Sequence, residues 1–437
     1  MIWSKILEKI VLPIGDVLNG SSFIRNLKYW REVDTLSEAE IHTLQKENLS
    51  KIIKHAIANT NHYKNVELSG SDPYEWLSSF PILTKDDLRE KSDDMLSEGK
   101  KNLTKLSSSG SSGISSSVYM NSKDLSSIRA GLIHWWEWTG YRMGVPLAQT
   151  GISPKRGLLK TIKDKLFRTI YINAFSHSKE QLRSLCLKLE KSKNYFLVGY
   201  ASSLNVIAEY ASSNNHNIKL RGVISLGDKL FSHYRKNITS TFLCKVYDTY
   251  GSAEGFLIGA EDDLEYMYIL SPQTFVEILD DNDNPLPDGE IGNIVVTRLD
   301  GFAMPLIRYK IGDIGSLLPK DKYPVKRKYK YPLLEKIVGR NTDIVKTKNG
   351  KSLVVHAFTG VFEYIPEIKQ FKVIQYNTDG VLIEYIKADG FSNKILEDIV
   401  VQLQKYLKDH SFNIEFKEVQ NIEPTKSGKP QIIKSYL

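Results

Sequence analysis

The runs GVISL at residues 222–226 and KVYDTY at residues 245–250 decide the fold class of this chain. Both are short, apolar and rich in β-branched or aromatic residues, a composition typical of strands. The stretch 202–210 has the apolar spacing of a helix, and strand and helix patterns alternate in this way over residues 105–300. The alternation predicts strand-helix-strand units and hence an α/β core.

The first hundred residues show a different pattern, in which apolar positions recur at helical spacing. An example is the stretch from Ser37 to Thr60, where Ser37 precedes Glu38 and Glu40 in what would be the first helical turn. The chain is therefore predicted to open with an α-rich region.

The region after the core predicts two further β-rich units. Residues 276–317 contain short strand patterns broken by turn residues, which indicates a small antiparallel sheet or a β-barrel-like part. After Gly339 the pattern is that of a compact β-hairpin-α-β module, with strands at 371–376 and 381–386, a helix at 392–408 and a strand at 413–419.

Length and composition set broad limits. The 437 residues exceed the roughly 250–300 at which a single hydrophobic core stops growing, so at least two domains are expected. A hydrophobic content of 41% and a charged content of 25% exclude a disordered, collagen-like or disulfide-scaffold chain. The two cysteines, Cys186 and Cys244, lack metal-type spacing, which favours a reducing compartment and a cytoplasmic location.

The N-terminus carries apolar residues at helical spacing, namely Ile2, Trp3, Ile6, Leu7, Ile10, Val11 and Leu12. Lys5, Glu8, Lys9 and Asp16 interrupt them, which excludes a membrane-spanning helix of about 20 apolar residues, and no small-residue cleavage site follows. We favour a helix packed on its own domain. The alternative is a helix in the membrane interface, which would place the protein peripherally at the inner membrane.

The net charge of +8 indicates anionic ligands, for which nucleotides or phosphate-linked carriers suffice, and no nucleic-acid-binding motif occurs. Basic residues interleaved with tyrosines gather in one stretch, residues 320–330. A solvated loop is one interpretation of this stretch, and contact with a phosphate-bearing acceptor is the other.

The run SSSGSSGISSS at residues 107–117 is the first candidate site. Its glycines let the backbone curl, so that hydroxyl and N–H groups can surround a phosphate. It lacks the lysine that a GxxxxGK[ST] loop requires. A flexible linker is the alternative for such a Ser/Gly-rich stretch.

Two further motifs contain acidic residues beside glycines. In YDTYGSAEG, residues 247–255, Glu254 is placed to hold Mg²⁺ on ATP oxygens, because magnesium needs only one or two carboxylates in addition to phosphates. In RYKIGDIG, residues 308–315, Asp313 follows a glycine at the end of a β-rich run and could accept hydrogen bonds from two ribose hydroxyls. The alternatives are a strand-end turn and an Asx-turn.

Two basic residues complete the set of candidates. Arg340 in VGRNTD, residues 338–343, joins two zones of different composition and could reach a nucleotide, or else belong to a polar linker. Lys429 in PTKSGKP, residues 424–430, follows Ser427 and Gly428 on a loop that is predicted to be exposed, where a solvated lysine is the alternative.

Taken together and in this order, the five segments resemble the adenylate-forming superfamily, which includes acyl-CoA synthetases, peptide-synthetase adenylation domains and luciferase. Within it the chain is similar to the phenylacetate-CoA ligase and coenzyme F390 synthetase branch, particularly the capsular polysaccharide biosynthesis proteins called CapK. This resemblance extends over nearly the whole chain and rests also on KHAIANTNHYKN at 54–65, FPILTKDDLRE at 80–90 and GYASSL at 199–204.

The resemblance implies the fold and the activity. It implies a large N-terminal domain at 1–338, a hinge at 339–343 and a small α+β mobile lid at 344–437. The implied enzyme is an ATP-dependent, AMP-forming ligase that activates a carboxylic acid as its AMP ester. Its acceptor would be coenzyme A or an amine, for example on an amino sugar. The resemblance to the CapK proteins implies a role in capsule or surface polysaccharide biosynthesis.

The resemblance also assigns site residues. Those matching the phosphate loop are Ser108, Ser109, Gly110, Ser111, Ser112 and Gly113. Those matching the aromatic-glycine-hydroxyl-x-glutamate motif are Tyr250, stacked near adenine, Gly251, Ser252 and Glu254, the Mg²⁺ ligand. The remaining matches are Gly227 and Asp228 in the adenine-contacting loop, Asp313 on the ribose, Arg340 beside the hinge and Lys429 as the catalytic lysine of the lid.

The chain departs from the family pattern at three positions. Ile114 and Ser115 replace a lysine and a proline of the phosphate loop, from which we expect altered loop mobility rather than lost function. Thr342 replaces the aspartate or lysine of the hinge, which bears on the ease of lid rotation. Some relatives carry a zinc-binding Cys/His cluster after the glutamate, but residues 259–271 contain neither residue type, so no zinc is predicted.

Three questions stay open at this point. Trp135, Trp136 and Trp138 either line an acyl pocket or pack in the core. An F390-synthetase-like transfer of AMP to a hydroxyl is an alternative activity. A catalytically inactive nucleotide-binding scaffold is a third interpretation, suggested by Ile114, Ser115 and Thr342 and opposed by the presence of Glu254 and Lys429.

Overall fold

The computed structural model describes most of the chain. The described residues are 2–107, 117–151, 157–174, 178–340, 344–348, 352–354, 358, 361–362, 365, 367–388, 390–407, 411–423 and 432–437.

The α-rich opening predicted for the first hundred residues is confirmed. It comprises α1 (Ile2–Ile6), the π-helix η1 (Leu7–Val11), α2 (Leu12–Asn19), α3 (Phe23–Val33), α4 (Glu38–Asn59), α5 (Pro73–Trp76) and α6 (Lys85–Glu90). At the start of α4, the Glu40 amide donates to Ser37 Oγ and the Glu40 carboxylate accepts from the Ser37 amide at 2.8 Å. This reciprocal capping explains why the helix begins where the sequence predicted.

An eleven-stranded sheet forms the centre of the molecule, in the order β10-β11-β12-β13-β9-β8-β7-β6-β5-β3-β4. Five strands at one end are parallel: β3 (Leu147–Gly151), β4 (Thr169–Asn173), β5 (Phe196–Tyr200), β6 (Gly222–Leu226) and β7 (Val246–Gly251). The two runs that opened the sequence analysis are β6 and β7, so the predicted α/β core is confirmed.

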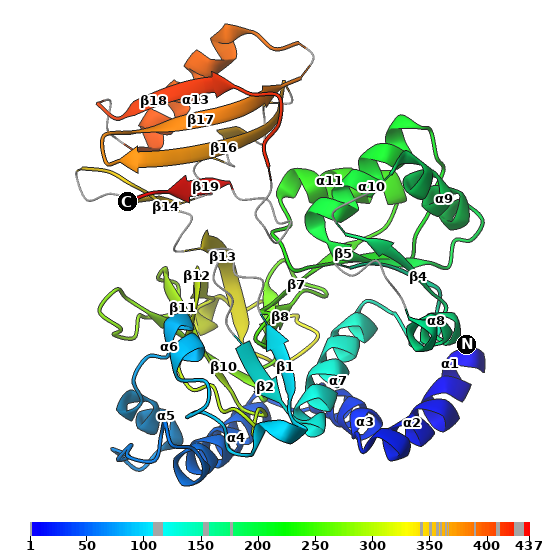
Figure 1. The fold of residues 1–437 in the computed structure, drawn as a ribbon, viewed down its shortest axis with the longest axis vertical. Helices are drawn as coiled ribbons and strands as arrows, with labels where there is room; N and C mark the ends of the chain where they lie inside the picture. Colours follow the sequence, from blue (N-terminus) through cyan, green and yellow to red (C-terminus); the bar gives the residue numbers. More distant parts are fainter. Residues whose placement is uncertain are drawn as a thin grey trace.

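Helices cover both faces of the parallel strands (Figure 1). α9 (Lys179–Glu190), α10 (Ala201–Ser213) and α11 (Ser232–Phe242) pack on the face that carries Leu197 and Val223. α7 (Ser122–Trp138) packs on the other face, against Val198 and Ile224, and α8 (Leu158–Leu166) precedes β4. β5 and β6, which lie inside the parallel part of the sheet, are buried along nearly their whole length and therefore read as continuous apolar runs in the sequence.

The antiparallel strands predicted after the core continue the same sheet. They are β8 (Leu257–Ala260), β9 (Met267–Ile269), β10 (Thr274–Leu279), β11 (Gly292–Arg298), β12 (Tyr309–Leu317) and β13 (Leu333–Arg340). β7 joins the two halves, because it pairs in parallel with β6 and antiparallel with β8. The sequence pattern suggested a separate small sheet or barrel, since single-strand patterns do not record which neighbour a shared strand pairs with.

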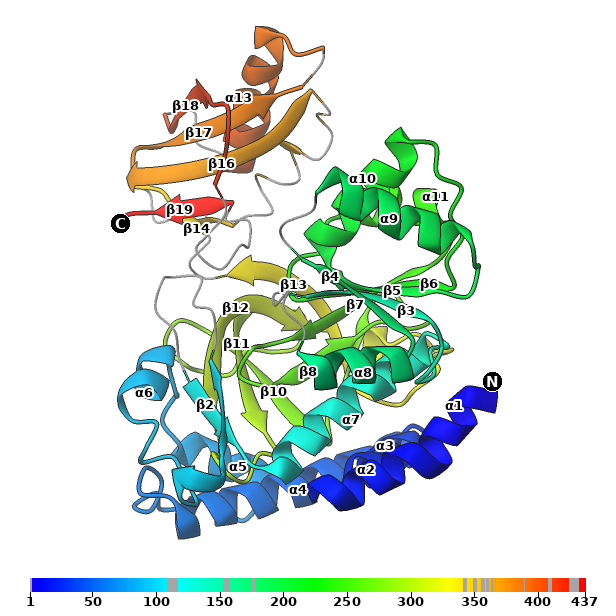
Figure 2. The same ribbon diagram turned by 45° about the vertical axis from the view of Figure 1, so that its right-hand side comes forward.

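The C-terminal module is confirmed with one added strand. β16 (Ile368–Asn377) and β17 (Gly380–Lys387) form the hairpin, α13 (Asn393–Leu407) and β18 (Asn413–Glu418) follow, and β19 (Ile433–Ser435) pairs with β16. Two short strands, β14 (Ile344–Lys346) and β15 (Ser352–Val354), precede it. The cluster of buried apolar residues here draws only on residues after 344, and Figures 1 and 2 show this sheet apart from the large one. The boundaries at 338 and 344 stay predictions.

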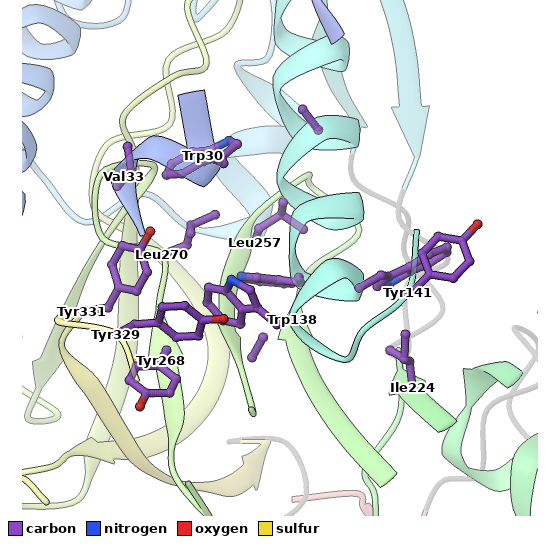
Figure 3. Packing of buried hydrophobic residues seen from close by; sticks show 14 of the residues in the cluster. Trp30, Val33, Trp138, Tyr141, Ile224, Leu257, Tyr268, Leu270, Tyr329 and Tyr331 are labelled. Atoms are coloured by element: carbon purple, nitrogen blue, oxygen red, sulfur yellow. The ribbon is translucent and has the colours of Figure 1, made fainter. Parts of the chain in front are cut away.

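An aromatic cluster joins α3, α7 and the segment before β13 (Figure 3). Trp138 stacks on Tyr329 with ring centroids 4.4 Å apart, and its indole N–H donates to Asp34. Trp135 and Trp136 are buried as well. For Trp138, the structure thus agrees with packing in the core rather than with an acyl pocket.

Candidate functional site

The loop after β7 holds Glu254 in a buried position. The Ser252 amide donates to the Phe256 carbonyl at 3.0 Å, and the Gly255 amide donates to the Ser252 carbonyl at 3.1 Å. A Cβ atom on Gly251 would lie 2.5 Å from the Phe256 carbonyl oxygen, so only glycine permits this close approach. A turn from Ser252 to Gly255 therefore follows β7, and Glu254 within this turn is 5% exposed.

Asp313 lies within β12, which corrects its predicted position at the end of a strand. The strand runs from Tyr309 to Leu317, and the register between β11 and β12 shifts around Asp313. Gly312 just before it has a positive φ of 84°, a conformation that interrupts regular strand geometry. The Asx-turn alternative is therefore wrong, and Asp313 is instead the register partner of Arg340 on β13.

Two tyrosine–carboxylate hydrogen bonds connect the β7 loop with β12. The Tyr250 hydroxyl donates to Asp313 Oδ2 at 2.8 Å, and the Tyr309 hydroxyl donates to Glu254 Oε1 at 3.3 Å. Each segment thus contributes a tyrosine and, four residues later, a carboxylate to the other segment. We call Tyr250–Asp313 and Tyr309–Glu254 the reciprocal tyrosine pairs.

The electrostatics of the second pair favour a fixed donor. Tyr309 is fully buried and stacks on Phe256 with ring centroids 5.9 Å apart. Burial first, and the nearby Glu254 carboxylate second, raise the pKa of Tyr309 far above its usual value. The phenol therefore keeps its proton at physiological pH and remains a donor to Glu254.

Sequence reasoning missed Tyr309, although a signal was present. The segments YGSAE, residues 250–254, and YKIGD, residues 309–313, share the spacing tyrosine-x-x-x-carboxylate. Only the fold shows that these two segments face each other and exchange hydrogen bonds.

A buried hydroxyl in the same loop supports a phosphate ligand. Within the described part of the chain, Ser252 Oγ is buried and has no hydrogen-bond partner. Buried polar groups almost always have one, so such an atom calls for an explanation such as a bound ligand. Glu254 beside it fits Mg²⁺ on ATP, since Mg²⁺ is held by one or two carboxylates together with substrate phosphates.

The predicted adenine-contacting loop follows β6. Gly227 has a positive φ of 80°, and a Cβ atom there would meet the Tyr200 ring at 2.5 Å. The Asp228 carboxylate accepts hydrogen bonds from the Ala201 and Ser202 amides and so caps α10. This loop lies at the carboxyl ends of the parallel strands, where ligands bind in open α/β sheets.

The next residue of this loop reaches the strand that leads to the predicted hinge. Lys229 Nζ donates to the Val338 carbonyl at 3.3 Å, so the β6 loop contacts β13 close to Arg340. The structure thereby brings together the β6 loop with Gly227 and Asp228, the end of β7 and its loop with Tyr250 and Glu254, Asp313 on β12, and the backbone of Arg340.

Several predicted residues lie outside the described residues, and their roles stay predictions. They are Ser108, Ser109, Gly110, Ser111, Ser112, Gly113, Ile114, Ser115, Thr342 and Lys429, together with the side chain of Arg340. The ends of the serine-rich run are informative nevertheless. Ser107, the last residue of β1 (Thr104–Ser107), is the register partner of Ser117, the first residue of β2 (Ser117–Met120). The run therefore connects two paired strands and is not a linker between domains.

Two further sequence-based expectations concern charge and metal. In the basic stretch 320–330, Arg327 pairs with Glu38 and Lys328 with Asp262, both at 2.6 Å, so part of its charge is already neutralised. No cluster of three or more His, Cys, Asp or Glu side chains suited to a metal occurs among the residues that the structure describes. The absence of zinc stays a prediction.

Comparisons with known proteins give a consistent picture. The family described as the CapK C-terminal domain matches residues 345–436. Protein CapK of Staphylococcus aureus is 26% identical over 420 residues, covering 92% of this chain and 91% of that protein. A phenylacetate-coenzyme A ligase of Pseudomonas putida is 24% identical over 365 residues, covering 77% of this chain and 79% of the ligase.

Solved structures share the fold. A 2-hydroxyisobutyryl-CoA ligase in the postadenylation state with R3-HIB-AMP superposes with a TM-score of 0.75 at 17% identity, covering 93% of this chain and 91% of the ligase. The same ligase with 2-HIB-AMP and CoA in the thioesterification state gives 0.61 at 18% identity, covering 93% and 92%. The predicted fold class, a large α/β domain with a small C-terminal domain, is thereby confirmed.

Proposed function

Because the chain is a CapK-like protein of the adenylate-forming superfamily, related to the phenylacetate-CoA ligases, we propose that it is an ATP-dependent ligase that activates a carboxylic acid as its AMP ester. The observation that carries this proposal is the pair of reciprocal tyrosine bonds. They bring the predicted magnesium ligand Glu254 and the predicted ribose ligand Asp313, separated by 59 residues of sequence, onto adjoining segments.

The proposed nucleotide contacts follow from this geometry. Asp313 would accept hydrogen bonds from the ribose hydroxyls, and Tyr250, bonded to Asp313, would place its ring beside the adenine. Glu254 would hold Mg²⁺, which when bound would offset the negative charge of the phosphates. Ser252 Oγ, buried next to Glu254, would donate to a phosphate oxygen.

In the first half-reaction a carboxylate oxygen of the acid attacks the α-phosphorus of ATP. A new P–O bond forms, the bond to the bridging oxygen breaks, and pyrophosphate leaves. Since both reactants are anionic, the protein must neutralise charge and align the attack. We assign this task to Lys429 of the lid and to the groups around Glu254.

In the second half-reaction a thiol or amine attacks the acyl carbonyl carbon, loses its proton, and AMP leaves. Because Lys429 would occupy the path of the acceptor, the lid would rotate about residues 339–343 between the two steps. The 2-hydroxyisobutyryl-CoA ligase, which shares the fold, has been solved in a postadenylation and in a thioesterification state, and these superpose on this chain with TM-scores of 0.75 and 0.61.

The acceptor and the biological role belong to the same proposal. Coenzyme A, giving a thioester, is supported by the relatives named phenylacetate-coenzyme A ligase. An amine on an amino sugar, giving an amide, is the alternative suggested by the CapK relative, and it would place the enzyme in capsule or surface polysaccharide biosynthesis on the cytoplasmic side.

The test is acid-dependent exchange of pyrophosphate into ATP over a panel of carboxylic acids, with hydroxylamine trapping of the acyl-AMP. One or more acids should stimulate exchange and yield a hydroxamate. Lys429→Ala should reduce the exchange rate by about 10²–10³ while leaving the melting temperature unchanged. Stimulation by phenols instead of acids would support AMP transfer to a hydroxyl, and ATP binding without exchange for any acid would support an inactive scaffold.

A further inference from the structure

The N-terminal helical run, Ile2 to Asn19, packs against the rest of the molecule through some side chains and exposes other apolar side chains to solvent. Leu7 is fully buried, and the Trp3 indole N–H donates to the Leu166 carbonyl at the end of α8 at 2.9 Å. The packed helix favoured from the sequence is thus present. The same run also exposes large apolar side chains, from 36% for Ile6 to 83% for Val17. This apolar stripe comprises Ile2, Ile6, Ile10, Ile14, Val17 and Leu18.

The π-helix η1 helps to keep the stripe straight. The isoleucines of the stripe recur every four residues. This spacing is longer than one turn of an α-helix, about 3.6 residues, and shorter than one turn of the wider π-helix. The π turn at Leu7–Val11 begins directly after Ile6 and contains Ile10, so its wider turn acts against the drift of the flanking α-helical turns.

A second element adds to this apolar surface. α8 exposes Leu158 at 79% and Ile162 at 55%, and its C-terminal end contacts α1 through the bond from Trp3 to Leu166. Figure 1 shows α1, α2 and α8 at the same end of the molecule. Apolar side chains exposed together on two contacting helices mark an interaction surface.

The charges of these two elements indicate the kind of partner. The exposed charged residues in Ile2–Asn19 and Leu158–Leu166 are all lysines, namely Lys5, Lys9, Lys160, Lys163 and Lys165, whereas the acids Glu8, Asp16 and Asp164 are partly buried. The acids of the N-terminal run are engaged: Glu8 pairs with Arg31 at 2.6 Å, and Asp16 accepts from the amides of Phe23 and Ile24. The surface is therefore apolar with a basic rim.

We propose that this surface, the apolar stripe with α8, docks on an anionic lipid bilayer, with the helices lying in the plane of the interface. An apolar helix face flanked by lysines has the composition of interfacial helices, and each lysine near an anionic surface strengthens binding roughly fivefold. A second copy of the chain fits less well, because a two-fold contact would bring lysine rows against lysine rows. This inference does not depend on the proposed catalytic function.

Vesicle flotation of the full-length chain tests the proposal. The protein should float with vesicles of equal parts phosphatidylglycerol and phosphatidylcholine, bind pure phosphatidylcholine far less, and be released by high salt. The variant with Ile6→Glu, Ile10→Glu and Ile14→Glu should lose flotation. Lys5→Gln with Lys9→Gln should weaken binding roughly thirtyfold, as expected for two lysines at a charged surface.

Matched controls distinguish binding through this surface from nonspecific hydrophobic adsorption to the vesicles. Val325→Glu and Val401→Glu change exposed valines elsewhere, at 95% and 65% exposure, and should leave flotation unchanged. The lysine variant keeps the apolar side chains, so it tests the proposal even if the glutamate variant unfolds. Wild-type protein that does not float, or a stripe variant that changes only the elution volume from dimer to monomer, would overturn the proposal.

Discussion

The two reciprocal tyrosine pairs use the same chemistry in different surroundings. Tyr309 and Glu254 are buried, whereas Tyr250 and Asp313 are both partly exposed. A hydrogen bond to a charge is stronger away from water, and a buried carboxylate that loses its donor cannot recover one from solvent. We infer that the buried pair Tyr309–Glu254 would fix the proposed metal ligand, while the partly exposed pair Tyr250–Asp313 would leave the proposed ribose ligand accessible.

The largest effect should come from Glu254→Gln, which removes the charge of the buried pair and keeps its shape. We expect acid-dependent pyrophosphate exchange to fall by about 10²–10³, since one positioned charged or polar group is commonly worth this much. Exchange rates at saturating Mg²⁺ check this. Exchange near the wild-type rate would remove Glu254 from the proposed metal site.

The next effect is that of Tyr309→Phe, which leaves the Glu254 carboxylate buried without this donor. The free energy of unfolding should fall by about 1–3 kcal/mol, and the Mg²⁺ concentration for half-maximal exchange should rise roughly tenfold. Urea unfolding and a Mg²⁺ titration measure the two quantities. A loss of stability with an unchanged Mg²⁺ requirement would show that Tyr309 acts only on packing.

Strand β7, which carries Tyr250, offers a test by pH. Asp248 lies on this strand beside Glu261, whose carboxylate accepts from the Asp248 amide and from Arg235. Burial, and then the charge of Glu261, raise the pKa of Asp248 to about 7. The folded state therefore binds more protons than the unfolded state between the usual aspartate pKa and about 7, so the contribution of Asp248 to stability declines as pH rises through that window.

Asp248→Asn should remove this decline. At pH 8 the variant should be more stable than wild type by on the order of 1 kcal/mol, with a flatter profile between pH 5 and 8. Chemical denaturation at a series of pH values measures the profile. Parallel profiles for the two proteins would contradict the assignment of the titration to Asp248.

The smallest effect is expected for Tyr250→Phe, the corresponding variant in the partly exposed pair Tyr250–Asp313. Asp313 can accept a hydrogen bond from water in place of the lost one, so the free energy of unfolding should fall by no more than about 0.5–1.5 kcal/mol. The retained ring should keep the maximal rate close to normal, and the KM for ATP should rise a few-fold. An effect as large as that of Tyr309→Phe would contradict the distinction between the buried and the partly exposed pair.

Local patterns predicted the elements of this fold well. β6 was recognisable because a strand buried on both faces forms a continuous apolar run, β7 because of its β-branched and aromatic residues, and α4 because Ser37 and Glu40 form a local capping box. The antiparallel strands were also recognised. That they join the parallel strands in one sheet was not predicted, because β7 pairs with β6 on one edge and with β8 on the other, and the sequence of a strand does not show which strands it pairs with.

The sequence identified several residues of the candidate site, but it did not predict which of them contact one another. Tyr250 and Glu254 were identified by motif, yet the bonds from Tyr250 to Asp313 and from Tyr309 to Glu254 join positions 63 and 55 residues apart. Asp228 was predicted to belong to the adenine-contacting loop, and the structure shows its carboxylate capping α10, which the sequence did not reveal. Such long-range hydrogen bonds follow from topology, which brings the β7 loop next to β12.

The loop after β6 has a mechanical consequence for a moving lid. Asp228 fastens this loop to the start of α10, and Lys229 fastens it to Val338, two residues before Arg340. Through these two bonds, β13, which leads to the C-terminal module, is connected to helix α10. In the proposed mechanism these bonds would hold the β6 loop to β13, so that rotation of the lid would take place beyond Val338.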